Sequence, residues 1–149
     1  MPTISESVEI ARSPEQVWRP LSEPERWLEG YVRTRVRSPE YPEQDARNDF
    51  VFHTRMDEEV SAQVVRSEAP TLLEERQAGR TFERDVRYRL ASTNGATRVS
   101  IEDEVTFKGL AKLAAPIAVR NIQRRWRRSL ERLREAAEAE TSPGPAGTA

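Results

Sequence analysis

The fold is decided by the last long periodic stretch of the chain, residues 108–138, which reads KGLAKLAAPIAVRNIQRRWRRSLERLREAAE. Its apolar residues recur at steps of three to five positions, the spacing of one buried face on an α-helix: Leu110, Leu113, Ile117, Ile122, Trp126, Leu130 and Leu133. About 30 helical residues extend roughly 45 Å, so this helix needs a long partner to pack on. Pro116 predicts a kink, or a short helical lead-in before the main helix.

Composition narrows the class of protein. The 149 residues carry 24 basic and 25 acidic side chains, so no overall field favours nucleic acid or an anionic membrane. The absence of cysteine excludes disulfides, thiolate metal sites and thiol catalysis. No apolar run approaches the length of a membrane span, and the N-terminus does not resemble a signal peptide. We expect one cytoplasmic domain over residues 1–140 without integral membrane association, and a disordered tail at 141–149.

The chain before Lys108 predicts strands, interrupted early by helix signals. Residues 4–11 alternate as a first strand. Ser13-Pro14-Glu15-Gln16 then combines an N-cap serine, a first-turn proline and a glutamine at the third position, and Ser22-Glu23-Pro24-Glu25 repeats the pattern, so two short helices are expected. The remaining strands are predicted to cover residues 31–37, 48–56, about 60–64, 71–77, 82–93 and 96–107.

Alternation within these strands predicts which side chains face the core. In the second strand, Val32, Thr34 and Val36 are expected inward and the arginines outward. In the third, Phe50 and Phe52 are expected inward and His53 outward. His53 is the only histidine, which excludes a histidine-rich metal site, and we expect neither a metal nor a cofactor.

The strongest hairpin signal is Asn94-Gly95, because a type I′ turn needs positive φ at both central residues. A two-residue turn there pairs Thr93 with Ala96 and fixes every later pair. One face then carries Leu90 opposite Val99, Tyr88 opposite Ile101, Val86 opposite Asp103, Arg84 opposite Val105 and Phe82 opposite Phe107, and the other face pairs Arg87 with Glu102. The register therefore turns Arg84 and Asp103 toward the interior.

The order of elements and several motifs resemble a known superfamily. The matching residues are Val8-Glu9-Ile10-Ala11 running into Ser13-Pro14-Glu15-Gln16-Val17-Trp18, Trp27 before the second strand, and Lys108-Gly109-Leu110 with Pro116 ahead of the last helix. Over roughly residues 3–138 the chain resembles the START-like (SRPBCC) superfamily, nearest its polyketide cyclase/dehydrase and lipid transport group. The resemblance implies an α+β helix-grip (Bet v 1-like) fold, in which a seven-stranded antiparallel sheet wraps around the long C-terminal helix. It also implies a deep apolar pocket that binds a hydrophobic small molecule.

Polar residues predicted to face that pocket are the candidates for chemistry. Arg84 and Asp103 are placed there by the hairpin, and Glu75 would stand opposite Arg84 if a two-residue turn falls at Gly79-Arg80. A guanidinium can hold a ligand oxygen while a carboxylate of raised pKa exchanges protons with the ligand. The alternative interpretation is a structural ion network that closes one end of the cavity.

The predicted walls of the pocket are apolar and aromatic, with one amide: Trp27, Phe50, Phe52, Tyr88, Leu113, Ile117 and Asn121. Trp126 is interpreted as core, and Arg124, Arg125, Arg127 and Arg128 around it as a solvated rim rather than a nucleic-acid surface.

These observations lead to three hypotheses. In the first, the protein binds a hydrophobic, oxygen-bearing small molecule in an internal cavity and catalyses polyketide-type cyclisation or dehydration, with Arg84, Asp103 and Glu75 as catalytic residues. In the second, the same cavity serves a non-catalytic carrier or sensor. In the third, the arginine-rich C-terminal helix is an interaction module. A monomer and a homodimer are both open.

Overall fold

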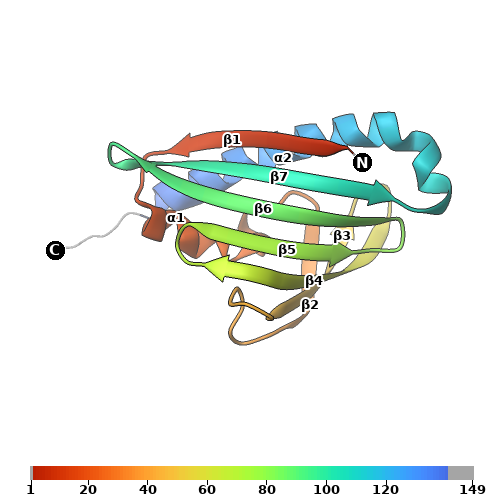
Figure 1. Cartoon of the computed structure of the whole chain (residues 1–149), viewed down its shortest axis with the longest axis horizontal. Coiled ribbons are helices and arrows are strands. Elements are labelled where there is room, and N and C mark those ends of the chain that lie inside the picture. The colour runs from red at the N-terminus through yellow and green to blue at the C-terminus, as the bar shows by residue number, and fades with distance from the viewer. Residues whose placement is uncertain (1, 141–149) are drawn as a thin grey trace.

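The computed structural model describes residues 2–140, so the predicted tail at 141–149 lies outside the described residues. Seven antiparallel strands form one curved sheet in the order β1-β7-β6-β5-β4-β3-β2, and helix α2 crosses one face of it (Figure 1). The elements are β1 (Thr3–Ile10), α1 (Pro14–Leu21), η1 (Pro24–Arg26), β2 (Tyr31–Arg37), β3 (Arg47–His53), β4 (Asp57–Glu68), β5 (Leu72–Ala78), β6 (Phe82–Thr93), β7 (Ala96–Phe107), η2 (Gly109–Ala114) and α2 (Ala115–Ala139). The predicted helix-grip architecture is confirmed.

The two short helices after β1 are confirmed only in part. Ser13 caps α1 as predicted, since its hydroxyl accepts a hydrogen bond from Gln16 N while the Gln16 side chain accepts one from Ser13 N. The second helix is a single 3₁₀ turn, Pro24–Arg26. Ser22 does not cap it, because the Ser22 hydroxyl donates to Trp18 O and closes α1 instead.

The β6–β7 hairpin has the predicted register. Asn94 and Gly95 have φ values of 51° and 84°, and pairing runs from Thr93↔Ala96 to Phe82↔Phe107. The preceding turn differs from the prediction, because Gly79 N donates to Phe82 O and moves the turn to residues 80–81. Gln77 rather than Glu75 therefore stands opposite Arg84. Glu75 still faces inward, because the shift of two residues preserves its side of the sheet.

The predicted orientation of β2 is wrong. Val32 and Val36 are 47% and 63% exposed, whereas Tyr31 packs against the core with its ring stacked on Phe50 at a centroid distance of 4.7 Å. Two irregularities in the β2–β3 register interrupt the alternation on which the prediction relied. As the last strand of the sheet, β2 pairs on one side only and tolerates them.

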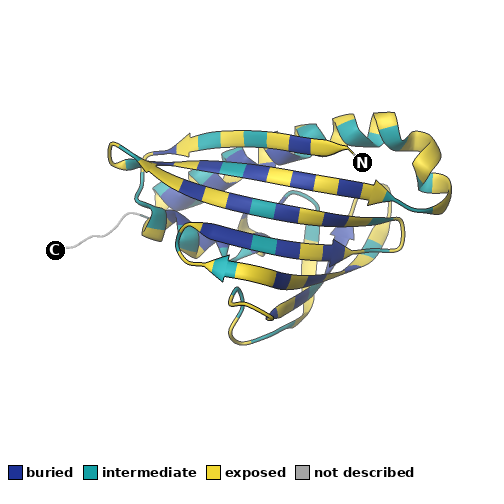
Figure 2. Ribbon diagram, viewed as in Figure 1, coloured by how far each residue is buried: buried dark blue, intermediate teal, exposed yellow. Residues whose placement is uncertain are grey.

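The core lies between the sheet and the C-terminal half of α2. Buried and exposed residues alternate along the strands (Figure 2). The inner faces meet the buried side chains of Trp126, Leu130, Leu133 and Ala137. Burial of this apolar stripe provides the free energy that holds α2 on the sheet, while the other faces of the helix are polar, as expected for an amphipathic helix.

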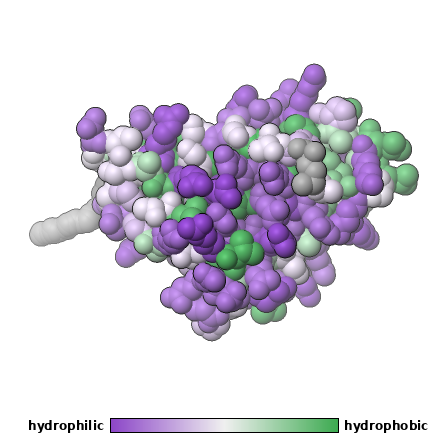
Figure 3. Space-filling view, viewed as in Figure 1, coloured by the Kyte–Doolittle hydropathy of each residue, from purple (hydrophilic) through white to green (hydrophobic). Residues whose placement is uncertain are grey.

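The short helix η2 and the start of α2 project past the end of the sheet (Figure 1). The predicted lead-in is confirmed, with Pro116 in the first turn of α2, where its missing N–H needs no partner. Leu113 is 82% exposed and Ile117 67%, Asn121 is exposed, and the surface over this end is hydrophobic (Figure 3). The prediction that these three residues overlook the pocket is wrong. The spacing of apolar residues in the sequence predicts which face of the helix is apolar, but it does not predict where along the helix the contact with the sheet ends.

Candidate functional site

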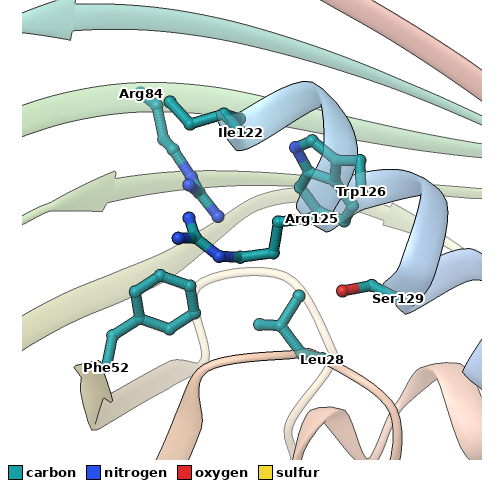
Figure 4. Close-up of a pocket in the computed structure, with 7 residues that line it drawn as sticks. All are labelled: Leu28, Phe52, Arg84, Ile122, Arg125, Trp126 and Ser129. Atoms are coloured by element: carbon teal, nitrogen blue, oxygen red, sulfur yellow. The ribbon is translucent and has the colours of Figure 1, made fainter. Parts of the chain in front are cut away.

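Residues within the described range 2–140 line two pockets on the inner side of the sheet. One encloses about 280 Å³ of empty space, solvent at its mouth included, and its lining includes Trp27, Leu28, Phe50, Glu75, Gln77 and Tyr88. The other encloses about 190 Å³, and its lining includes Leu28, Phe52, Arg84, Arg125, Trp126 and Ser129 (Figure 4). Because those volumes include open solvent, the space left for a ligand is only about 10 Å³ in each pocket, room for about one water molecule, whereas pockets for drug-sized ligands have about 300–1,000 Å³. The single deep pocket expected from the sequence is therefore not open in this structure, and Leu28 lines both pockets.

An aromatic cluster packs beside both pockets. The Trp27 ring lies 6.0 Å from the ring of Tyr88 and 6.3 Å from that of Trp126, and Tyr88 and Trp126 are 6.0 Å apart between centroids. The two contacts of Tyr88 are edge-on, at interplanar angles of 82° and 72°, a favourable arrangement for aromatic rings. The cluster gives the site rigid apolar walls built from the end of η1, β6 and α2.

Glu75, on β5, is the buried carboxyl group of the larger pocket, only 4% exposed. The Tyr41 hydroxyl donates a hydrogen bond to Oε2, and Gln77 Nε2 donates one to Oε1 at 3.0 Å. Burial raises the pKa of Glu75 above its ordinary value, although both hydrogen bonds and the charge of Arg84 act in the opposite direction. Glu75 can therefore exchange a proton closer to neutral pH than an ordinary glutamate.

Tyr41 comes from the loop between β2 and β3, and Arg37 holds it by stacking 5.2 Å from the centre of its ring. Burial and the adjacent Glu75 carboxylate raise the pKa of Tyr41 well above its ordinary value. The hydroxyl consequently remains protonated and acts as a hydrogen-bond donor to Glu75. Burial likewise raises the pKa of Tyr88.

Asp103 and Arg84 form a second polar group under α2. Asp103 is fully buried, and its Oδ2 accepts a hydrogen bond from Trp126 Nε1 at 2.8 Å and lies 3.8 Å from Arg84 Nη1. Within residues 2–140, Asp103 Oδ1 and Arg84 Nε have no hydrogen-bond partner. Trp126 covers Asp103, so the carboxylate is shielded from the pocket. Its hydrogen bond to Trp126 and its charge beside Arg84 hold the helix and Arg84 in position.

The structure thus separates the three predicted catalytic residues. Glu75 lines the larger pocket with Trp27, Phe50 and Tyr88, whereas Arg84 lines the smaller one with Phe52, and Asp103 lies beneath Trp126. The described residues include no ion pair between Glu75 and Arg84, and the two interact only through the longer-range effect of the Arg84 charge on the Glu75 pKa.

Sequence reasoning missed several lining residues, of which Arg125 matters most. The sequence places it on the solvated rim, but it is half-buried and its guanidinium carbon lies 5.3 Å from the Phe52 ring centre. Its position three residues after Ile122 and four before Ser129 is a signal that it borders the buried stripe. Tyr41, in a turn-rich segment, offers no such signal.

The remaining rim arginines behave as predicted. Arg124, Arg127 and Arg128 are exposed, and Arg128 is held by Glu29 at 2.6 Å. Arg127 Nε lies 3.2 Å from Glu6 on β1. Two of the arginines that could dock a partner are thus engaged by carboxylates of the same chain.

Other candidate chemistry is limited within the described residues. His53 is exposed, as predicted, and its Nδ1 lies 2.8 Å from Asp57 Oδ1. Residues 2–140 contain no group of three or more histidine, aspartate or glutamate side chains placed to hold a metal ion. No helix in the same range has the length and apolar character needed to cross a bilayer.

Comparisons with known proteins agree with this architecture. The family model described as polyketide cyclase/dehydrase and lipid transport matches residues 1–138. No curated protein matches the sequence significantly.

Solved structures show the same fold at low sequence identity. TTHA0849 from Thermus thermophilus aligns with a TM-score of 0.76 and 15% identity over 95% of this chain and 100% of that one. Ara h 8.0201 aligns with a TM-score of 0.71 and 8% identity over 93% of this chain and 99% of that one. DynU16, from the dynemicin biosynthetic locus, has a TM-score of 0.66 and 16% identity over 91% of this chain and 47% of that one.

Proposed function

Because the chain belongs to the polyketide cyclase/dehydrase and lipid transport family, we propose that it binds a hydrophobic, oxygen-bearing small molecule between the sheet and α2. The observation that carries the proposal is Glu75, a buried carboxyl group of raised pKa in a pocket whose other walls are mostly aliphatic and aromatic. Buried polar groups in apolar surroundings are costly, and such groups fix the orientation of a ligand's oxygen. Displacement of Leu28, which lines both pockets, would give the ligand a larger volume.

The same arrangement supports catalysis of dehydration or cyclisation. The Glu75 carboxylate accepts a proton from the carbon next to a ligand carbonyl, and Arg84 stabilises the negative charge that develops on a ligand oxygen. In a dehydration, the new carbon–carbon double bond forms as the β-hydroxyl leaves, and Glu75 returns its proton to that hydroxyl, which departs as water. Asp103 holds Trp126 and Arg84 in place and does not meet the ligand.

A non-catalytic carrier is the second candidate. The observation in its favour is that Glu75 and Asp103 each accept hydrogen bonds from the protein itself, from Tyr41 and Gln77 and from Trp126. A carboxylate satisfied in this way contributes to a specific core and to ligand orientation without transferring protons.

Native mass spectrometry of the purified protein tests for binding, since a tightly bound apolar ligand is retained in the gas phase. A neutral fluorescent probe, Nile red, tests the same pocket in solution. Leu28→Trp fills the space between the two pockets and should abolish probe binding, whereas Val36→Trp, on the exposed side of β2, should leave it unchanged. If the wild type retains no ligand and does not bind the probe, the proposal fails.

Glu75→Gln separates the two candidates. An enzyme loses turnover of a bound polyketide-type substrate but keeps its affinity, because the amide has the shape of the acid and cannot exchange the proton. A carrier shows no turnover in either form and similar affinity in both.

A further inference from the structure

The smaller pocket contains two guanidinium groups. Arg84 reaches into it from β6 and Arg125 from α2, and the two groups point toward one another above the ring of Phe52 (Figure 4). Their guanidinium carbons lie 6.0 Å and 5.3 Å from the centre of that ring. Guanidinium groups carry a positive charge, so two like charges lie close together at a site partly shielded from solvent.

The protein compensates the charge of Arg84 incompletely. Arg84 is only 7% exposed, and its ion-pair partner is Asp103 at 3.8 Å, beyond hydrogen-bond distance. The nearest Asp103 oxygen is already bound to Trp126 Nε1, and Arg84 Nε has no hydrogen-bond partner within residues 2–140. A donor buried to this extent without a partner destabilises the protein, and more so when it is charged, unless a ligand satisfies it.

Arg125 has even less compensation. It forms no ion pair among the described residues, and both oxygens of Glu29 are bound by Arg128 at 2.6 and 2.7 Å. Burial, and then the charge of Arg84, lower the pKa of Arg125, which reflects the same unfavourable meeting of two cations. The pocket therefore carries an excess of positive charge.

The rest of the lining suits an amphipathic anion. Leu28, Phe52 and Ile122 provide apolar walls. The hydroxyl of Ser129 accepts a hydrogen bond from Glu29 N at 2.9 Å, which leaves its own proton to donate. The polar groups that remain to be satisfied here are thus mainly donors, as an anion requires.

We propose that Arg84 and Arg125 bind the carboxylate of a hydrophobic organic acid, whose hydrocarbon part extends past Leu28 toward Trp27 and Tyr88. The inference rests on the proposed function and deepens it by naming the chemistry of the ligand's polar end. A planar carboxylate matches the forks of two guanidinium groups and cancels their mutual repulsion. A neutral alcohol or ester leaves both charges uncompensated, so the site discriminates against it.

The test uses a matched pair of fluorescent probes, 11-(dansylamino)undecanoic acid and its methyl ester. The wild type should bind the acid at least about 10-fold more tightly than the ester, because each charge-assisted hydrogen bond is worth about a factor of 10 to 100. Arg125→Met, which keeps the bulk of the side chain and removes its charge, should weaken binding of the acid by about 10- to 100-fold and that of the ester by less than about threefold. Arg124→Met is the matched control, since the adjacent Arg124 is exposed and lies outside the pocket.

Each outcome is decisive. Equal affinity of the wild type for acid and ester, or equal losses in Arg125→Met and Arg124→Met, would overturn the carboxylate site while leaving the hydrophobic pocket intact. If the wild type binds neither these probes nor Nile red, the proposed function itself fails, and the inference with it. Circular dichroism confirms that both variants are folded before the affinities are compared.

Discussion

Replacing Glu75 by glutamine should make the protein increasingly more stable than the wild type as the pH rises. Burial raises the pKa of Glu75 in the folded state above its ordinary value of 4.5. A carboxyl group with a raised folded-state pKa contributes stability that is fully present below the unfolded-state pKa and is lost as pH rises through the folded-state value. Glutamine has nearly the same shape as the protonated acid and does not titrate, so the variant escapes this loss.

The magnitude follows from proton linkage. The free energy of unfolding of Glu75→Gln minus that of the wild type should increase by at most about 1.4 kcal/mol per pH unit, because one proton is involved. The increase begins near pH 4.5 and levels off above the folded-state pKa. The height of the plateau, divided by about 1.4 kcal/mol, gives the elevation of the pKa in pH units.

The assay is urea denaturation, followed by tryptophan fluorescence, at half-unit steps from pH 4.5 to 9. Taking the difference between two proteins cancels groups that titrate alike in both. Glu40→Gln, at an exposed loop position, controls for the loss of one negative charge. A Glu75→Gln difference that is flat over this range, or that falls with rising pH, would refute the account of Glu75 as a carboxyl held in its protonated form by burial.

Four further substitutions test the packing of α2 and the β6–β7 turn. Leu133→Ala should lower the free energy of unfolding by about 2–5 kcal/mol, because Leu133 is fully buried. Ile117→Ala should lower it by less than about 0.5 kcal/mol, because Ile117 is 67% exposed. Equal losses of the two variants in urea denaturation would contradict the position of α2. Trp126→Phe should cost about 1–3 kcal/mol in the same assay, because it removes the 2.8 Å hydrogen bond to the buried Asp103 carboxylate. Gly95→Ala should lower the free energy of unfolding by about 1 kcal/mol, measured as a lower thermal midpoint. The loss comes from the φ of 84° alone, because no atom lies within 4 Å of an added Cβ.

The parts of the fold that could be predicted are those in which local chemistry fixes long-range geometry. Asn94-Gly95 selects one turn, and that turn alone sets twelve pairs between β6 and β7, including the inward placement of Arg84 and Asp103. The inward placement of Glu75 could also be predicted, although the predicted turn before β6 is wrong, because an error of two residues preserves the face.

The parts that could not be predicted depend on where elements end in space. Val32 and Val36 alternate like core residues, yet the bulged edge strand leaves them in solvent. Ile117 continues the helical stripe of Trp126, but it lies in the first turn of α2, where the stripe is left in solvent and Ile117 is 67% exposed. Arg125 lies on the flank of the stripe, and only the approach of Phe52 and Arg84 from the sheet turns it from a surface residue into a pocket residue.

The two pockets are coupled through Arg84. Its positive charge lowers the pKa of Glu75, against the larger effect of burial. A carboxylate bound between Arg84 and Arg125 would offset that charge, and the pKa of Glu75 would then rise further. Binding of an organic acid should therefore be accompanied by proton uptake at Glu75, and by linkage the acid should bind more tightly to the protein whose Glu75 is protonated. Since the proposed dehydration begins with the Glu75 carboxylate accepting a proton, this proton uptake would favour binding of the acid and oppose the first step of the reaction.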